Sequence, residues 1–179
     1  MHPTVRLAFA ASLFVAGGAL AQTPAADLLL DRATPAVGCA NFEGLRTAGT
    51  LVLLDTRTGA VRTCGTGRAR ERFLPASTFK IANALNALES GLVRDEFQAL
   101  RWDGVDRGVP AWNADASLAS GMRDSTVWFY QALARGAGRP AMQVLVDRLD
   151  YGNRDVGGGL DRFWLDGELR ISAAEQVVF

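Results

Sequence analysis

The apolar and polar positions of the N-terminal third predict a short helix followed by a hairpin of two strands. Three consecutive leucines, Leu28–Leu30, indicate the helix, within residues 24–33. The β-rich run Gly49–Asp55 is followed by a turn at 56–59 and a second extended segment at 60–63. A lone hairpin is marginally stable in water, so further strands or a covering helix are expected.

After the hairpin, the apolar positions recur at helical spacing. Helices are expected over residues 77–90, 127–134 and 140–149, the last beginning at a proline. In the first of these, Ile81, Leu85 and Leu88 share one face, and Gly91 follows as the glycine that ends the helix. The chain beyond the hairpin is therefore expected to be mainly helical.

The end of the sequence predicts one more helix. Ser172 and Glu175 form a capping-box pattern, and the segment continues as far as the apolar residue Phe179. Only two good strands are visible in the whole sequence, which is few for a stable sheet. We therefore expect one incomplete domain over residues 22–179, of the α/β class and the α+β sandwich type, whose C-terminal strands are missing.

The composition indicates a globular protein without an extended charged surface. Apolar residues make up 49% and charged residues 21% of the chain, and the formal net charge is zero. No block of basic residues is present, so neither a nucleic acid nor an anionic membrane surface is expected as a partner. The only histidine is His2, which excludes Ser-His-Asp catalysis and histidine zinc sites from the rest of the chain. No metal and no organic cofactor are expected.

The first 21 residues predict a secretory signal peptide. Arg6 supplies a positive start, Leu7–Leu20 is largely apolar, and Ala19-Leu20-Ala21 matches a small-residue cleavage site. An uncleaved membrane anchor is the alternative, although the apolar run is shorter than the ~20 residues of a spanning helix. We expect export to a bacterial periplasm, with no membrane attachment after cleavage.

Export would place the two cysteines in an oxidising compartment, where Cys39 and Cys64 can form a disulfide. They flank the predicted hairpin, so the distance between them is feasible. Two free, buried cysteines are the alternative, and the sequence leaves both open.

Lys80 is the most informative residue, because it is the only lysine among nineteen basic residues. An amine can lose its proton when buried and then act as a base, whereas a guanidinium cannot. Ser77 precedes it by one helical turn, so the amine can reach the serine oxygen. Burial by Phe79, Ile81 and their neighbours would lower the pKa of the amine. The helix start would favour a developing oxyanion at Ser77, whose alternative role is a plain N-cap.

Three further segments carry candidate chemistry: Ser125-Thr126-Val127, Tyr151-Gly152-Asn153 and Phe163-Trp164-Leu165-Asp166-Gly167. Each is weak alone, since Ser125 can be a helix cap and Trp164 ordinary core. Their order and spacing after the Ser77–Lys80 pair make the set specific.

Together with Pro75-Ala76-Ser77-Thr78-Phe79-Lys80, Arg101-Trp102-Asp103-Gly104 and Trp112, these segments resemble the class D serine β-lactamases, or oxacillinases. The resemblance runs from about Leu51 to Phe179. It implies a β-lactamase/transpeptidase-like fold, with an antiparallel sheet flanked by helices plus a helical lobe. It also implies hydrolysis of β-lactam antibiotics.

The resemblance implies a role for each matching residue. Ser77 would be the nucleophile, and Lys80 would react with carbon dioxide to give a carbamate (N6-carboxylysine) that serves as the general base. Ser125 would pass a proton to the departing lactam nitrogen, and Trp164 would hydrogen-bond the carbamate. The residues expected to line the substrate cleft, keep the lysine pocket apolar or shape the loop beside it are Trp112, Val127, Leu165, Tyr151 and Asn153.

One departure from the family pattern concerns a further motif. The family also uses a Lys-Thr/Ser-Gly motif on a central strand, and the only lysine of this chain is already at position 80. That strand supplies a second oxyanion N–H, and losing one such donor typically costs about 2–4 kcal/mol of transition-state stabilisation, so reduced activity is expected of this chain by itself. Three alternatives stay open: a penicillin-binding sensor domain that is acylated without turnover, a transpeptidase acting on peptidoglycan, and an inert fragment.

Overall fold

The structure is a computed structural model that describes residues 25–42 and 48–179. The predicted signal peptide, residues 1–21, lies outside the described residues. The helices are α1 (Ala25–Asp31), α2 (Thr66–Arg70), α3 (Lys80–Glu89), α4 (Leu118–Arg123), α5 (Val127–Arg148) and α6 (Ala173–Val178), with 3₁₀ turns η1 (Cys39–Phe42), η2 (Ala76–Phe79) and η3 (Pro110–Trp112). The strands are β1 (Thr34–Pro35), β2 (Leu51–Leu54), β3 (Val61–Cys64), β4 (Arg72–Phe73) and β5 (Ile171–Ser172).

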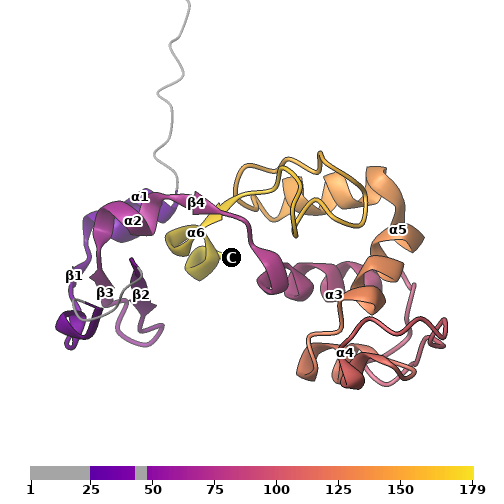
Figure 1. Cartoon of the computed structure of the whole chain (residues 1–179). Coiled ribbons are helices and arrows are strands. Elements are labelled where there is room, and N and C mark those ends of the chain that lie inside the picture. The colour runs from indigo at the N-terminus through magenta and orange to yellow at the C-terminus, as the bar shows by residue number, and fades with distance from the viewer. Residues whose placement is uncertain (1–24, 43–47) are drawn as a thin grey trace, which may run out of the picture.

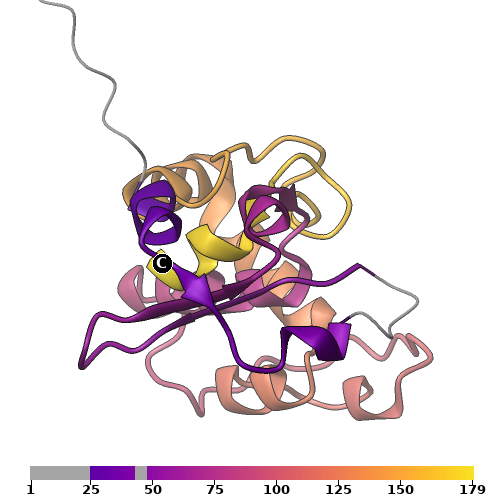
Figure 2. The same cartoon turned by 90° about the vertical axis from the view of Figure 1, so that its left-hand side faces the viewer.

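The predicted hairpin forms the larger of two small sheets. β2 and β3 pair antiparallel, with Leu51 opposite Cys64 and Leu54 opposite Val61. β1 adds to the other edge of β3 in parallel, so the strand order is β1-β3-β2 and the sheet is mixed rather than purely antiparallel. Helices α1, α2 and α6 pack together on one face of this sheet, around Leu29, Leu30 and Ala174 (Figures 1 and 2). The covering helices that a lone hairpin needs are thus α2, directly after β3, and α1 and α6, from distant parts of the chain.

The helical part is built on the packing of α3 against α5 (Figure 1). The two helices predicted over 127–134 and 140–149 are both present. They form the two halves of α5, which is interrupted by the non-helical backbone of Gly138 just before Pro140. The predicted C-terminal glycine of α3 is confirmed, because Gly91 has φ +72° and donates its N–H to the Leu88 carbonyl.

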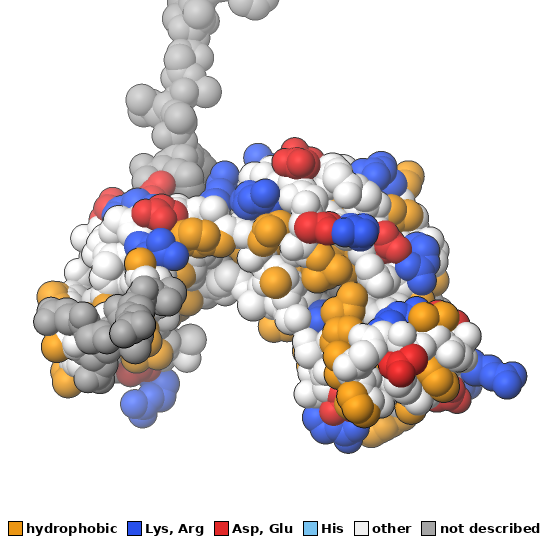
Figure 3. All heavy atoms as spheres, viewed as in Figure 1, with side chains coloured by type: hydrophobic (Ala, Val, Ile, Leu, Met, Phe, Trp, Pro, Cys, Tyr) orange, Lys and Arg blue, Asp and Glu red, His pale blue; other side chains and the backbone are white. Residues whose placement is uncertain are grey.

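The apolar face predicted for α3 is not its buried face. Ile81, Leu85 and Leu88 are 49%, 49% and 41% exposed, and α3 instead buries Lys80, Ala82, Asn83, Asn86 and Ala87. The expected part of Ile81 in burying Lys80 therefore stays a prediction. Helical periodicity identified the apolar stripe correctly, but it does not determine which stripe a neighbouring helix covers. Figure 3 shows the open hollow between the sheet part and the helical part of the molecule.

The disulfide alternative for the cysteines is the one that forms. Cys39, in η1, is bonded to Cys64 at the end of β3, with Cα atoms 5.4 Å apart. The bond joins two residues that are 25 positions apart in sequence and holds η1 against the sheet. The alternative of two free cysteines does not apply.

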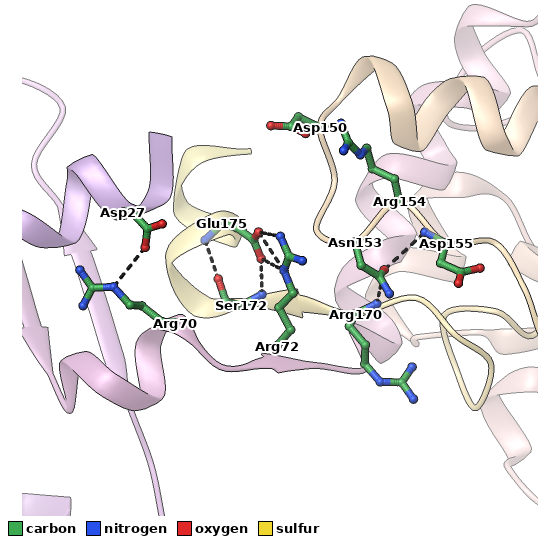
Figure 4. Close-up of polar contacts among 10 residues, drawn as sticks. All are labelled: Asp27, Arg70, Arg72, Asp150, Asn153, Arg154, Asp155, Arg170, Ser172 and Glu175. Atoms are coloured by element: carbon green, nitrogen blue, oxygen red, sulfur yellow. Dashed lines mark hydrogen bonds and ion pairs between the residues drawn. The ribbon is translucent and has the colours of Figure 1, made fainter. Parts of the chain in front are cut away.

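The chain crosses between the sheet part and the helical part through β4 and β5, which pair with each other. The predicted capping box is present at the start of α6, where Ser172 Oγ accepts from Glu175 N–H and the Glu175 carboxylate accepts from Ser172 N–H. In Figure 4, Arg72 of β4 also meets this carboxylate, with its Nε 3.0 Å from both oxygens. Glu175 thereby ties the crossing strand to the last helix. No helix that the structure describes is long and apolar enough to span a bilayer.

Candidate active site

Ser77 lies in a strained turn that leads into α3. The residue before it, Ala76, has φ +48°, a left-handed conformation that costs a non-glycine residue roughly 1 kcal/mol. Ala76 N–H donates to the Trp164 carbonyl at 2.9 Å, which holds this conformation in place. The first hydrogen bond of the turn runs from Thr78 N–H to the Pro75 carbonyl, and no backbone hydrogen bond of the described residues uses Ser77 N–H. The Ser77 N–H is therefore free to donate to a substrate oxygen.

The Ser77, Lys80 and Ser125 side chains form a hydrogen-bonded triangle. Lys80 Nζ donates to Ser77 Oγ at 2.7 Å and to Ser125 Oγ at 3.0 Å. The two serine oxygens are 2.9 Å apart. Ser77 makes no capping bond, so the alternative of a plain N-cap does not hold. All three atoms are close enough for direct proton transfer between any two of them.

Lys80 is buried although it carries an ionisable amine. Only 1% of the residue is exposed, and its Nζ lies 5.7 Å from the centroid of the Tyr130 ring. Burial lowers the pKa of the Lys80 amine from its ordinary value of 10.5, because a charged ammonium loses hydration there. Burial also raises the pKa of Tyr130 to about 12, which keeps its phenol neutral. The site therefore lowers the free-energy cost of deprotonating the amine that lies beside the Ser77 and Ser125 hydroxyls.

We expect Lys80→Met to remove a pH dependence of stability. Between the lowered native pKa and 10.5, the unfolded chain binds more protons than the folded chain, so the free energy of unfolding rises with pH. The slope can reach about 1.4 kcal/mol per pH unit. The variant should lack this slope and be more stable than the wild type at neutral pH. Urea unfolding from neutral to alkaline pH measures it, and equal slopes in the two proteins would contradict the burial of a titrating amine.

Ser125 is presented by a tight connection between α4 and α5. It has φ +53°, and the next residue, Thr126, donates its N–H to the Gly121 carbonyl at 2.8 Å. Trp112 braces this connection, because its Nε1 donates to the Asp124 carbonyl at 3.0 Å. The half-buried Trp112 thus lies next to the serine turn, a position compatible with its predicted place beside the cleft.

The aromatic turn packs beneath the nucleophile. Trp164 is 1% exposed and stacks on Phe79, with ring centroids 5.4 Å apart. The structure gives its indole N–H no hydrogen-bond partner among the described residues, so its predicted bond to a carbamate stays a prediction. Val127, the first residue of α5, and Leu165 are both half-buried. Their predicted role in keeping the lysine pocket apolar also stays a prediction.

The Tyr151-Gly152-Asn153 loop lies behind the site rather than in it. Tyr151 is fully buried, meets the Phe79 ring edge-on at 5.4 Å, and its hydroxyl accepts from Gln176 at 2.8 Å. Asn153 N–H donates to the Arg170 carbonyl, and its Oδ1 accepts from Arg170 N–H (Figure 4). The structure therefore corrects the grouping of Tyr151 with substrate-contacting residues, since its side chain is inaccessible. That both residues shape the loop beside the cleft stays a prediction.

Two neighbours of the site were not identified from the sequence. Tyr130, whose ring faces Lys80, and Asn83, which is buried on the same helix, belong to apolar-rich helical segments with no motif of their own. No metal-ligand cluster of three or more His, Cys, Asp or Glu side chains occurs within residues 25–42 and 48–179.

Comparison with known proteins assigns this geometry to a family. The sequence profile of the penicillin binding protein transpeptidase domain matches residues 49–179. The chain belongs to this family. Within the family, its relatives are class D β-lactamases. It is 46% identical over 133 residues to a probable β-lactamase, YbxI, of Bacillus subtilis, and 44% identical over 140 residues to β-lactamase OXA-48 of Klebsiella pneumoniae.

Solved β-lactamases have the same fold. The BPu1 β-lactamase superposes with a TM-score of 0.76 at 46% identity, covering 81% of this chain and 62% of that chain. A class D β-lactamase from Sebaldella termitidis gives a TM-score of 0.77 at 31% identity, covering 82% and 59%. The β-lactamase/transpeptidase-like fold expected from the resemblance is thereby confirmed.

The chain spans about half the length of the curated relatives it matches. It covers 50% of YbxI and 53% of OXA-48, while the matches take up 74% and 78% of this chain. Of the sequence motifs that suggested class D membership, those at Ser77, Lys80 and Ser125 converge in one hydrogen-bonded group.

Proposed function

We propose that this chain carries the acyl-transfer site of a class D β-lactamase, which opens the β-lactam ring by forming an ester on Ser77. The observation that carries the proposal is the triangle of Ser77, Lys80 and Ser125, in which a buried amine contacts both hydroxyls. A serine is a weak nucleophile unless an adjacent base takes its proton. The triangle supplies that base at 2.7 Å.

The remaining roles follow from the position of each group. As the Ser77 oxygen attacks the lactam carbonyl, its proton passes to the base at position 80. The free Ser77 N–H, at the start of the turn leading into α3, donates to the oxyanion that develops. Ser125, in contact with both partners, returns a proton to the lactam nitrogen as the ring opens. Trp112 would line the cleft, a role supported by its hydrogen bond to the Asp124 carbonyl beside the Ser125 turn.

We also propose carbon dioxide as the group that modifies Lys80. Carbamate formation requires an uncharged amine, and burial of Lys80 lowers the pKa of that amine. Bound there as N6-carboxylysine, it would provide carboxylate-type oxygens that are unprotonated at neutral pH and can accept the proton in both attack and deacylation. The Trp164 indole N–H would hold it by donation, with Val127 and Leu165 excluding water. No other cofactor and no metal is included in the proposal.

The proposal places the protein in a bacterial periplasm, after export directed by residues 1–21. Support comes from the sequence pattern of that segment and from the Cys39–Cys64 disulfide, a bond typical of oxidising compartments. Its partners would be small β-lactam antibiotics, without nucleic acid and without membrane attachment after cleavage.

A second candidate is a penicillin-binding domain that is acylated but does not turn over. The matching profile is that of a penicillin-binding transpeptidase domain, which favours acylation without deciding deacylation. The two candidates differ only in whether water attacks the Ser77 ester. A transpeptidase and an inert fragment remain the weaker alternatives.

We expect a fluorescent penicillin to label the purified chain with one equivalent on Ser77. The buried amine lowers the cost of serine attack, whereas Ser77→Ala removes the attacking oxygen and should abolish labelling. The measurements are gel fluorescence with peptide mapping, and hydrolysis of a chromogenic cephalosporin with added bicarbonate.

The outcomes separate the candidates. Continuous hydrolysis supports the β-lactamase, and a single stoichiometric burst supports the sensor domain. If the folded chain takes no label at any penicillin concentration, the proposed function is wrong.

A further inference from the structure

Asn83 is a buried amide that joins the two helices on which the site is built. It is 1% exposed, and its Nδ2 donates to the Tyr130 carbonyl of α5 at 2.9 Å. Its Oδ1 is buried with no hydrogen-bond partner among the described residues. A buried acceptor without a partner destabilises the folded state, and an apolar side chain of the same size would avoid that cost. Stability alone therefore does not account for an asparagine here.

The position of this bond relates it to the catalytic triangle. Asn83 follows Lys80 by three residues on α3, and residues three apart lie on the same face of a helix. Tyr130 follows Val127, the first residue of α5, by the same spacing, and Ser125 precedes that helix start by two residues. Lys80 is thus on α3, and Ser125 lies just before α5. The hydrogen bond from Asn83 to the Tyr130 carbonyl joins these two helices, about one helical turn from each of the two residues.

The acceptor residue also touches the lysine pocket. The Tyr130 ring lies 5.7 Å from Lys80 Nζ, while the Tyr130 carbonyl receives the Asn83 amide. Tyr130 therefore lines the lysine pocket with its ring and accepts the hydrogen bond from α3 with its carbonyl. A shift of α5 relative to α3 would move the ring away from the amine and admit water.

We propose that Asn83 is a positioning residue that holds Lys80 against Ser77 and Ser125 by locking α3 to α5. The Asn83 amide donates to a main-chain carbonyl, so the hydrogen bond holds the backbone of α5 and not only a side chain. It acts through Lys80 and does not touch the substrate. The catalytic consequence rests on the proposed function, whereas the effect on the lysine environment does not.

The single lysine of the chain makes the test direct. Protein labelled with ¹³C at lysine Cε gives one signal, from Lys80, whose pH titration reports the pKa of its amine. The groups that face this amine are the Ser77 and Ser125 hydroxyls and the Tyr130 ring, and desolvation is the cause that lowers its pKa. None of these three groups is charged at neutral pH, so the midpoint reports hydration of the amine.

We expect Asn83→Leu to raise the titration midpoint of Lys80 by about half a pH unit or more, because a loosened α3–α5 contact hydrates the amine. Asn86→Leu is the matched control. Asn86 is 9% exposed on the same helix, one turn further from Lys80, and its Nδ2 has no partner among the described residues, so it makes no lock. Its variant should titrate like the wild type. If Asn83→Leu also keeps the wild-type midpoint, the positioning role is overturned.

Acylation by a fluorescent penicillin supplies the second readout. The rate of Ser77 labelling should fall roughly ten-fold or more in Asn83→Leu and stay unchanged in Asn86→Leu, since small misplacements of reacting groups reduce rates strongly. Thermal unfolding of both variants shows that each is folded. If the wild type is not labelled while the Asn83→Leu midpoint still rises, the proposed function fails and the positioning role stands. Equal midpoints in all three proteins would overturn the positioning role even if labelling is normal.

Discussion

Lys80→Arg is expected to reduce acylation of Ser77 by a factor of about 100 to 10,000, the usual contribution of a general base. Arginine keeps the positive charge and the hydrogen-bond donors, but it has no accessible neutral form at any physiological pH. It can therefore neither take the Ser77 proton nor react with carbon dioxide. The initial rate of labelling by a fluorescent penicillin, relative to the wild type, measures the loss.

Two companion variants make this result specific. Lys80→Met removes the amine without adding volume or charge, so it should be folded and equally unreactive, which separates lost chemistry from lost structure. Arg57→Lys makes the reverse exchange in the exposed β2–β3 turn, where the side chain is 88% exposed. It should label at the wild-type rate. If Lys80→Arg labels as fast as Arg57→Lys, the base is another group.

The sequence predicted the site better than it predicted the packing around it. A single lysine one helical turn after a serine predicted the Ser77–Lys80 contact, because helix geometry fixes that distance locally. The contact with Ser125 lies 45 residues from Lys80 in sequence and was expected only through the family resemblance. Local spacing contains no information on such long-range contacts.

The fold was predicted where the signals were local. The β2–β3 hairpin, both halves of α5 and the capping box of α6 follow from turn residues, a proline and a Ser-x-x-Glu pattern. The parallel pairing of β1 with β3 did not, since a two-residue strand has no periodicity to detect. The buried face of α3 was also missed, because the residues buried there are a lysine, two asparagines and two alanines rather than large apolar residues.

The strained turn at Ser77 shows how distant segments converge on the nucleophile. Ala76 adopts its left-handed conformation while donating to the carbonyl of Trp164, far along the chain on the aromatic turn. Trp164 and Tyr151 both pack on Phe79, which follows Ser77 in the same 3₁₀ turn. The aromatic turn and the Tyr151 loop therefore support the site indirectly, by fixing the backbone conformation of the turn that presents Ser77.

Gly152 is the residue on which the Tyr151 loop depends most. It has φ +57°, and a Cβ placed on it would lie 1.9 Å from the Arg170 carbonyl oxygen. That same oxygen accepts the Asn153 N–H at 2.9 Å, so it cannot move away without breaking the bond between the two segments. Any side chain at position 152 must therefore separate the loop from the strand that precedes α6.

We expect Gly152→Ala to lower the free energy of unfolding by roughly 3 kcal/mol or more, because backbone strain and a main-chain clash add together. Gly59→Ala is the matched control. Gly59 has φ +72°, but a methyl group added to it would meet nothing within 4 Å, so it should cost only the backbone strain, about 1 kcal/mol. Urea unfolding measures both variants. Equal losses of unfolding free energy in the two variants would mean that the loop moves to accommodate the methyl group. A larger loss in Gly152→Ala, together with slower Ser77 labelling of its folded fraction, would show that the loop supports the nucleophile through Tyr151 and Phe79.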